Sequence, residues 1–381
     1  MSRLAPPREG ERITVRKRPL SFSFWPLYRT SRRFGLQSTV FALDPWILIR
    51  SSIKSRCPAA SLPEALSCLE QSQDFYSASA TAGMMASRPL LLYYCFMNLM
   101  KAYALTVQQQ SSFDQAQHGF SERLRPSRRE LDDAFLQAFT SPNTRNGALN
   151  LFDEFLKAIS GSGLVADINL DLPVLLPQIV PGHRLWAEAA NSRERFISVH
   201  DIGFNVNYAS NEIWITLDLF ADDLTRLGIS RATFLSEARL YGTFREVKSD
   251  VNIGGRRILR FEQILANHYT GRPSDEVPNL VAAIKPFLWA TVASVPPYRR
   301  YYLYLAPAAE QPQILPQLLS IYAITYYLGS ITRYRPHHFD AIAQGRMGPR
   351  IEEFISGQPL QFIYLLASEF AKQDVTKPSI V

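Results

Sequence analysis

The sequence lacks the short motifs that most often bind phosphate or metal ions. None of the patterns GxxxxGK[ST], GxGxxG and HExxH occurs in its 381 residues, which excludes the commonest nucleotide-binding loops and zinc-protease helices. A GxSxG nucleophile elbow is missing as well, and Ser160–Gly163 (SGSG) is typical of a flexible connector. The aspartate pairs Asp167/Asp171 and Asp222/Asp223 have no histidines at ligand spacing, so we interpret them as surface or capping carboxylates. No metal and no cofactor is therefore predicted.

Cysteine and long apolar runs are also scarce. The three cysteines form no CxxC pair, which argues against a disulfide framework or a zinc cluster and fits a reduced, cytoplasmic setting. The N-terminal charges are not followed by the apolar segment of a secretory signal. The most apolar run, residues 89–107, contains Asn98 and Lys101 near its middle, where a membrane span would tolerate them poorly. We therefore predict a soluble cytoplasmic protein without membrane contact, and interpret this run as a buried helix.

The composition is that of a folded protein with a basic N-terminus. Hydrophobic residues make up 46% of the chain and charged residues 20%, which excludes a disordered chain. Residues 1–40 carry nine basic side chains and two acidic ones, so this segment holds the whole net charge of +7. We interpret it as an arm that is either a solvated tail or a contact for a polyanion. Its basic residues are Arg3, Arg8, Arg12, Arg16, Lys17, Arg18, Arg29, Arg32 and Arg33.

The periodicity of apolar residues predicts an α+β protein. We expect a mainly α-helical bundle, with an inserted antiparallel β-sheet of about four strands. Four segments follow from this pattern: a basic and aromatic arm over 1–60, an N-terminal helical part over 61–162, a strand-rich insert over 163–270, and a C-terminal helical part over 271–381. The C-terminal helices are expected to pack with the N-terminal ones.

Local signals place the individual elements. Helices are expected over 62–82 and 87–107, a polar loop over 108–130, and two short helices over 128–140 and 147–160. Alternation over 195–265 predicts the strands, and Gly254-Gly255 is a strong hairpin signal. Helical periodicity then returns over 275–294, where Pro286 should break the helix, and again over 314–334.

The helix expected over 88–105 carries an unusual polar strip. Tyr94, Asn98 and Lys101 are spaced so that they share one face of an otherwise apolar helix. Because burying an unpaired amide or ammonium costs several kcal/mol, these groups need partners. Two interpretations stay open: a hydrogen-bonded seam between helices, or a strip that faces a ligand.

A second unusual segment, YLGSITRYRPHHFD, covers residues 327–340. Tyr326, Gly329 and Arg333 share one helix face, and Gly329 would let a partner helix or a phosphate approach closely. Pro336 suits the first position of a following helix. His337 and His338 would then lie in its first turn, where the helix dipole favours neutral imidazole. A neutral imidazole beside a guanidinium can take a proton from a 2′-hydroxyl while the arginine holds the phosphate. The alternative is a corner between two helices, with its arginines bonded to carbonyls or acids.

These two segments together resemble a known family. Ser87–Tyr94 (SRPLLLYY), followed by Asn98-Leu99 and Lys101-Ala102, is similar to the RPL-x-x-YY-x-x-x-NL-x-KA helix of YaaC-like bacterial proteins. Ser330–Pro336 (SITRYRP) is similar to their later S-x-x-RYRP motif, and Asp44–Trp46 (DPW) also fits. The resemblance spans most of residues 40–370. It implies family membership, and little about activity, since that family is largely uncharacterised.

A more distant resemblance is to HEPN domains, which are all-α and often dimeric. Their nuclease members carry R-x4–6-H at a helix start, and Arg333-x4-His338 has that spacing. The resemblance implies that Arg333 and His338 are catalytic and meet across a dimer axis to cleave RNA without metal. The substrate-binding residues predicted beside them are Arg335, His337, Tyr94, Asn98, Lys101 and Arg88.

Two functions are therefore predicted. The first is a YaaC-like protein that binds RNA or nucleotide, as a homodimer and as a metal-independent ribonuclease in a bacterial defence or toxin setting; that setting rests on the resemblance alone. The alternative is a non-enzymatic interaction protein that works through a protein partner or an oligomer.

Overall fold

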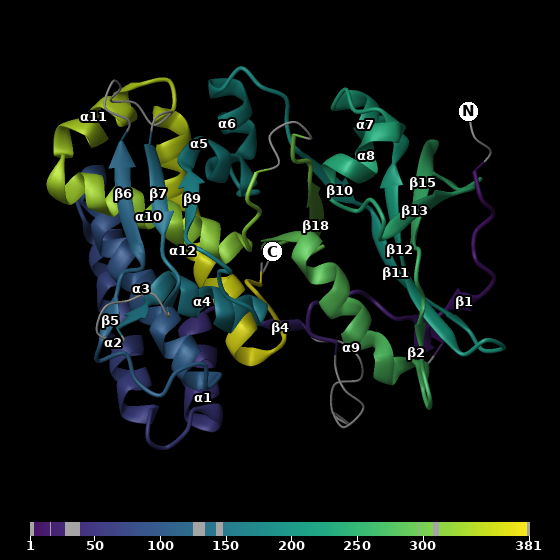
Figure 1. The fold of residues 1–381 in the computed structure, drawn as a ribbon, viewed down its shortest axis with the longest axis horizontal. Helices are drawn as coiled ribbons and strands as arrows, with labels where there is room; N and C mark the ends of the chain where they lie inside the picture. The colour runs from purple at the N-terminus through teal and green to yellow at the C-terminus, as the bar shows by residue number, and fades with distance from the viewer. Residues whose placement is uncertain are drawn as a thin grey trace. The chain divides into compact units, whose positions relative to one another are not determined.

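The computed structural model describes residues 4–15, 17–26, 39–124, 134–141, 148–295, 297–307 and 312–378. Helices and strands both contribute substantially to these residues, so the α+β class is confirmed (Figure 1). The chain forms two compact units, each assembled from segments that lie far apart in the sequence. Unit 1 comprises Met1–Phe41, Glu194–Pro312 and Lys372–Val381, and unit 2 comprises Ala42–Arg193 and Gln313–Ala371.

Unit 2 is mainly helical. Its long helices are the ones that the apolar periodicity predicted, and α3 packs against α2, α10 and α12 (Figure 1). The helices are α1 (Pro45–Arg56), α2 (Leu62–Thr81), α3 (Arg88–Thr106), α4 (Leu151–Ser160), α5 (Leu172–Leu175), α6 (His183–Ala189), α10 (Gln317–Tyr334), α11 (Pro336–Gln344) and α12 (Gly348–Ala371). The strands are β5 (Ala116–Gln117), β6 (Phe120–Leu124), β7 (Ala134–Ala138), β8 (Leu149–Asn150) and β9 (Ile168–Asp171).

The ends of these helices follow local signals. The Asp44 side chain accepts a hydrogen bond from the Trp46 N–H at 2.9 Å and so caps α1. Pro89 lies in the first turn of α3, and Pro336 begins α11 directly after α10 ends at Tyr334, as predicted. The sequence RYRPHH therefore forms a junction between two helices.

The prediction of a short helix over 128–140, in unit 2, is wrong. Residues 134–138, within the short helix expected over 128–140, form strand β7, which pairs antiparallel with β6 and β9. Ala134, Leu136 and Ala138 are buried and the residues between them less so, which is the two-residue period of a strand. The loop expected over 108–130 likewise contains β5 and β6. Five residues are too few to separate a strand from a helix by periodicity alone.

The other short helix, α4, is confirmed and carries two buried acids. The Lys157 ammonium lies 2.9 Å from the Asp153 carboxylate and 2.8 Å from that of Glu154. Burial alone would raise the pKa of Glu154, but hydrogen bonds from Lys157 and from neighbouring Ser and Gln side chains outweigh it and lower that pKa. These ionised groups hold α4 and the segments around it together.

Unit 1 is built on a larger sheet than the four strands expected. Its antiparallel order is β1-β11-β12-β15-β13. In addition, β14 pairs with β15 and β16 pairs with β12. Gly254 and Gly255, with φ of 58° and 78°, form the predicted hairpin between β14 and β15. The strands of this sheet are β1 (Glu11–Arg12), β11 (Asp201–Asn207), β12 (Glu212–Phe220), β13 (Phe244–Val247), β14 (Asn252–Ile253), β15 (Arg256–Gln263) and β16 (Asn267–His268).

A second sheet of unit 1 has the order β10-β18-β17. The helix expected over 275–294 ends at Ile284, and residues 289–292 form a strand, because Pro286 stops the helix as predicted. The remaining elements are β2 (Thr14–Val15), β3 (Arg18–Pro19), β4 (Thr39–Phe41), β10 (Phe196–Val199), β17 (Trp289–Val292), β18 (Arg299–Tyr304), β19 (Asp374–Thr376), α7 (Ala221–Arg226), α8 (Arg231–Glu237) and α9 (Pro273–Ile284). Residues 273–304, assigned from the sequence to the C-terminal helical part, thus belong to unit 1 with the strand-rich segment.

The basic arm is partly built into unit 1. Strand β1 pairs with β11, and the Arg12 guanidinium lies 2.5 Å from the Asp201 carboxylate. Arg8 donates to the Ile264 carbonyl at 2.7 Å. These two arginines therefore stabilise the sheet. The arginines of the arm that lie outside the described residues are Arg3, Arg16, Arg29, Arg32 and Arg33.

Candidate functional site

The candidate site lies in unit 2, where α10 crosses α3. Gly329 of α10 sits against the backbone of α3: a Cβ added there would lie 3.2 Å from the Pro89 carbonyl oxygen and 3.4 Å from the Leu90 Cα. The absence of a side chain at Gly329 allows this close approach. The expectation that Gly329 admits a close neighbour is met by a helix, and the crossing places the two unusual segments of the sequence side by side.

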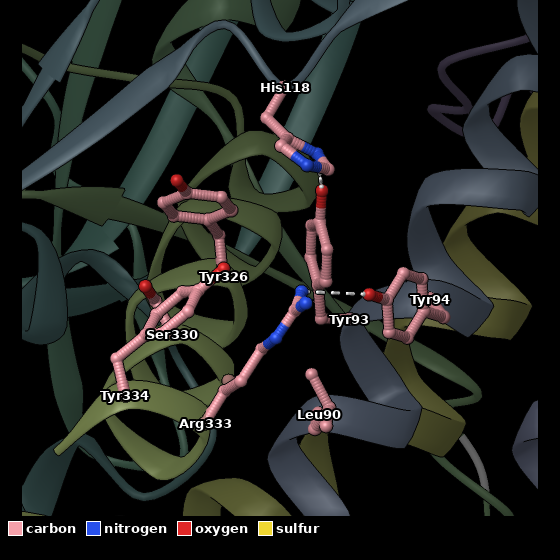
Figure 2. Close-up of a pocket in the computed structure, with 9 residues that line it drawn as sticks. Leu90, Tyr93, Tyr94, His118, Tyr326, Ser330, Arg333 and Tyr334 are labelled. Atoms are coloured by element: carbon pink, nitrogen blue, oxygen red, sulfur yellow. Dashed lines mark hydrogen bonds between the residues drawn. The ribbon is translucent and has the colours of Figure 1, made fainter.

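A small pocket opens beside this crossing (Figure 2). Its volume is about 60 Å³. One water requires about 10–15 Å³ by the same kind of measure, so the pocket holds a single group of a few heavy atoms and not a whole nucleotide. The lining residues all belong to unit 2 and are Leu90, Tyr93, Tyr94, His118, Tyr326, Gly329, Ser330, Arg333 and Tyr334.

Arg333 provides the positive charge of the pocket. Its side chain is exposed, its Nη1 donates to the Tyr94 hydroxyl at 3.5 Å, and its guanidinium lies 4.9 Å from the centre of the Tyr334 ring. Figure 2 shows the guanidinium pointing toward Tyr94. Within the described parts of the chain, no carboxylate forms an ion pair with Arg333. Both contacts are with uncharged groups, so the cation is oriented but not neutralised.

His118 lies in the loop that precedes β6, and its side chain faces Tyr93, which lines the same pocket as Arg333. Its Nδ1 forms a short hydrogen bond with the hydroxyl of Tyr93 (Figure 2). Loss of hydration lowers the pKa of His118, and the nearby cations Lys101 and Arg333 lower it further. Burial raises the pKa of Tyr93 far above neutrality, so Tyr93 keeps its proton. Because a phenol donates better to imidazole than to the Met97 sulfur 3.3 Å away, we infer that Nδ1 accepts and that Nε2 of His118 carries the proton.

Aromatic rings form the wall behind these groups. The ring centroids of Tyr93 and Tyr326 lie 5.3 Å apart, and those of Tyr326 and Phe120 lie 4.9 Å apart. Burial raises the pKa of Tyr326 to about 12, so this phenol is also uncharged. These rings give the pocket an uncharged, apolar wall beside the exposed guanidinium of Arg333.

The other residues predicted around RYRPHH lie outside the pocket lining. Arg335 forms a short ion pair with Glu122 of β6, and His337 is exposed on α11. His338 is buried in the first turn of α11, and its backbone N–H donates to the Arg335 carbonyl at 2.8 Å. The structure therefore brings Arg333, and not His338, to the pocket; the roles predicted for the two stay predictions.

Of the polar strip of α3, one residue lines the pocket and the other two lie outside its lining. Tyr94 lines the pocket, whereas the buried Asn98 donates to the Gln71 side chain of α2 at 3.3 Å. Lys101 is half-buried and acts on the pocket only through its charge near His118. Arg88, at the start of α3, donates to the Ala82 carbonyl at 3.3 Å. Asn98 thus joins α3 to α2, as the seam interpretation expected, and Arg88 joins the start of α3 to the end of α2.

His118 was missed by the sequence reasoning. It lies in the polar stretch QQQSSFDQAQHGF, which has no periodicity and no companion motif. Its importance depends on a contact with Tyr93, 25 residues earlier, and on the position of α10, some 200 residues later. The described residues also contain no group of three or more His, Cys, Asp or Glu side chains able to hold a metal. Of the helices in the described ranges, none combines the length and the apolar content needed to cross a bilayer.

Comparison with known proteins supports one assignment. The model of the YaaC-like protein family matches residues 41–370, most of the chain. The chain belongs to the YaaC-like family. No curated protein and no solved structure matches it.

The two family-like motifs meet in the pocket of this YaaC-like protein. The motif SRPLLLYY, in which α3 begins, supplies Leu90, Tyr93 and Tyr94, and the motif SITRYRP at the end of α10 supplies Ser330, Arg333 and Tyr334. Segments about 240 residues apart in the sequence thus build one surface. The residues that the two motifs share with the pocket make it the candidate site of this protein.

Proposed function

We propose that this YaaC-like protein binds a phosphate group of RNA or of a nucleotide in the pocket between α3 and α10. The observation that carries the proposal is Arg333, which is exposed, oriented by Tyr94 and Tyr334, and not paired with a carboxylate of the described residues. A guanidinium donates to phosphate through a fixed fork of N–H groups. The volume of about 60 Å³ suits one such group.

His118 supports the same proposal. Its inferred Nε2–H is a second donor for an anionic oxygen, and its lowered pKa keeps the ring uncharged near neutral pH. A carboxylate ligand would satisfy Arg333 equally well. The neutral donor beside the cation and the aromatic wall favour a phosphate attached to a larger, partly apolar molecule such as a nucleotide.

Binding is tested with a fluorescently labelled single-stranded RNA oligonucleotide, by anisotropy, on the full chain. Arg333→Ala should weaken binding about 10- to 100-fold, the equivalent of a charge-assisted hydrogen bond of about 1.5–3 kcal/mol. The matched control is Arg184→Ala, which removes an arginine of α6 with 80% of its side chain exposed. This control should bind within about twofold of the unchanged protein. Equal affinity of the Arg333 and Arg184 variants, or no binding of RNA and nucleotide at all, would overturn the proposal.

RNA cleavage without metal is the finer part of the proposal. Arg333 would hold the phosphate while a neutral imidazole takes the proton of the 2′-hydroxyl. The 2′-oxygen then bonds to phosphorus, and the bond to the 5′-oxygen breaks as that oxygen takes a proton from water. His338 is the base predicted from the sequence. His118 lines the pocket as a donor, because its Nδ1 is engaged by the Tyr93 hydroxyl and its Nε2 carries the proton. The likeness to HEPN domains, the homodimer and the defence or toxin setting belong to this finer part and stay predictions.

Cleavage of a labelled RNA in the presence of EDTA tests the catalytic part. If His338 is the base, His338→Ala should reduce the rate by at least 100-fold, since general-base catalysis contributes about 10²–10⁴-fold. Cleavage that this substitution leaves unchanged, or no cleavage, would reject the ribonuclease and leave the binding proposal standing.

The second candidate is a non-enzymatic interaction protein. The contacts of Arg335 with Glu122, of Arg88 with Ala82 and of Asn98 with Gln71 favour it, because three predicted substrate-binding residues are used within unit 2. This candidate predicts either that the protein binds RNA without cleaving it, or that it neither binds nor cleaves RNA. Co-purification of a protein partner that Arg333→Ala releases, with RNA affinity unchanged, would favour this candidate over the first.

A further inference from the structure

Tyr334 is an exposed aromatic residue at the pocket rim, in a position to contact a larger ligand. It is the last residue of α10, and 64% of it is exposed although the ring is large and apolar. A single exposed aromatic residue is ordinary on a protein surface. Tyr334 differs because it lines the pocket and lies beside the guanidinium of Arg333.

The pocket leaves the rest of a phosphate ester outside. With a volume of about 60 Å³ it takes the phosphate and excludes the sugar and the base, which must lie against the rim. Of the other tyrosines that line the pocket, Tyr93 and Tyr326 pack on each other. Tyr94 is half-buried and stacked on Phe75, with ring centroids 5.3 Å apart and planes 26° from parallel. Tyr334 stacks on no other ring among the residues that the structure describes. The Arg333 guanidinium lies over its ring, so the ring can offer its other face to a base next to the cation.

We propose that Tyr334 stacks on the nucleobase next to the phosphate held by Arg333, so that the pocket selects single-stranded RNA or a free nucleotide. This inference rests on the proposed function and adds the class of ligand. A base that stacks on a side chain must be unstacked from its neighbours, which is easy in a single strand and costly within a duplex. Inorganic phosphate and sugar phosphates should bind only weakly, because they lack the ring.

The test compares three probes on the full chain: a labelled single-stranded RNA, the same RNA annealed to its complement, and inorganic phosphate as a competitor. Stacking of one base contributes a factor of about 5 to 150 in affinity. Tyr334→Ala should therefore weaken binding of the single strand by that factor, and Tyr334→Phe should bind like the unchanged protein, because the ring remains. The inhibition constant of inorganic phosphate should change less than twofold in both variants.

The control is Tyr241→Ala, which removes a tyrosine of unit 1 that is 82% exposed and should leave all three measurements unchanged. The unchanged protein should also bind the duplex at least 10-fold more weakly than the single strand. Single-strand binding that Arg333→Ala abolishes but Tyr334→Ala leaves intact would overturn this inference and leave the proposed function standing. Equal affinity for duplex and single strand would overturn it too, whereas binding insensitive to Arg333→Ala would remove both proposals.

Discussion

Gly329→Ala is the substitution that most directly probes how the pocket is built. The added Cβ would lie 3.2 Å from the Pro89 carbonyl oxygen and 3.3 Å from the Tyr93 Cβ, closer than van der Waals contact on both sides. Alanine in a helix interior is favoured over glycine by about 1 kcal/mol, whereas overpacking an interface costs about 1–3 kcal/mol. We expect a net destabilisation of up to about 2 kcal/mol, accompanied by a small separation of α3 from α10.

Gly357→Ala on α12 is the matched control. Its Cβ would lie 3.0 Å from the Glu353 Oε1, and no backbone atom of the described residues outside α12 comes as close. The other carboxylate oxygen of Glu353 pairs with Arg350, so the side chain has to shift slightly while keeping that pair. This variant keeps the gain in helix propensity and pushes on no neighbouring helix, so it should be stabilised by up to about 1 kcal/mol. Urea unfolding of both variants measures the difference, which we expect to be about 1–3 kcal/mol.

The same pair of variants links stability to the site. Because Arg333 and Tyr93 lie on the two helices that Gly329 holds together, Gly329→Ala should also weaken RNA binding, and Gly357→Ala should not. The reasoning would be refuted if Gly329→Ala proved as stable as Gly357→Ala, since the close approach of the helices would then impose no constraint.

Three further predictions concern charges and backbone. The pKa of His118, followed by NMR, should rise toward its ordinary value in Arg333→Ala, because the variant loses one of the cations that lower it; an unchanged pKa would contradict the geometry of the pocket. Gly182, with φ of 72°, packs on the carboxylate of Glu353, so Gly182→Ala should lose about 2–4 kcal/mol of stability in urea unfolding, and full stability would contradict this packing. Because the pKa of Glu154 is lowered on folding, its contribution to the free energy of unfolding is complete above about pH 4.3 and is lost as the pH falls through the lowered pKa. Glu154→Gln should therefore reduce the steepness of acid unfolding measured by circular dichroism, and an identical acid profile would show that Glu154 is not the group responsible.

Long apolar patterns, together with clear signals for helix ends and turns, made much of the fold predictable. The helices α2, α3 and α10 follow from apolar periodicity and from boundary residues such as Gly83 after α2, Pro89 at the start of α3 and Pro336 after α10, and the β14–β15 hairpin follows from Gly254-Gly255. Strand β7 was missed because it has only five residues, and an apolar pattern of that length fits a short helix as well as a strand. The observation that decides for a strand is its pairing with β6 and β9, which come from other segments of the chain. Pairing between strands is a tertiary property that local propensity does not contain.

The site was predictable only in part, for a similar reason. Tyr94 and Arg333 were recognised because each shares a helix face with other polar or aromatic groups. Their meeting depends on the crossing of α3 and α10, for which Gly329 was the only local sign. His118 had no sign at all, because its role arises from the hydrogen bond with Tyr93 and from the nearby cations. His338 had the expected spacing, but that spacing does not determine which side of α11 faces the protein interior, and its side chain is buried.

The most direct test of the central claim is to locate bound RNA on the protein. A single-stranded RNA that carries 4-thiouridine is bound to the full chain, crosslinked by ultraviolet light, and the attached peptides are identified by mass spectrometry. The account predicts crosslinks to the end of α10 around Tyr334 and to the start of α3 around Tyr94, both lost in Arg333→Ala. Crosslinks confined to unit 1, or crosslinks at the pocket that survive Arg333→Ala undiminished, would contradict it.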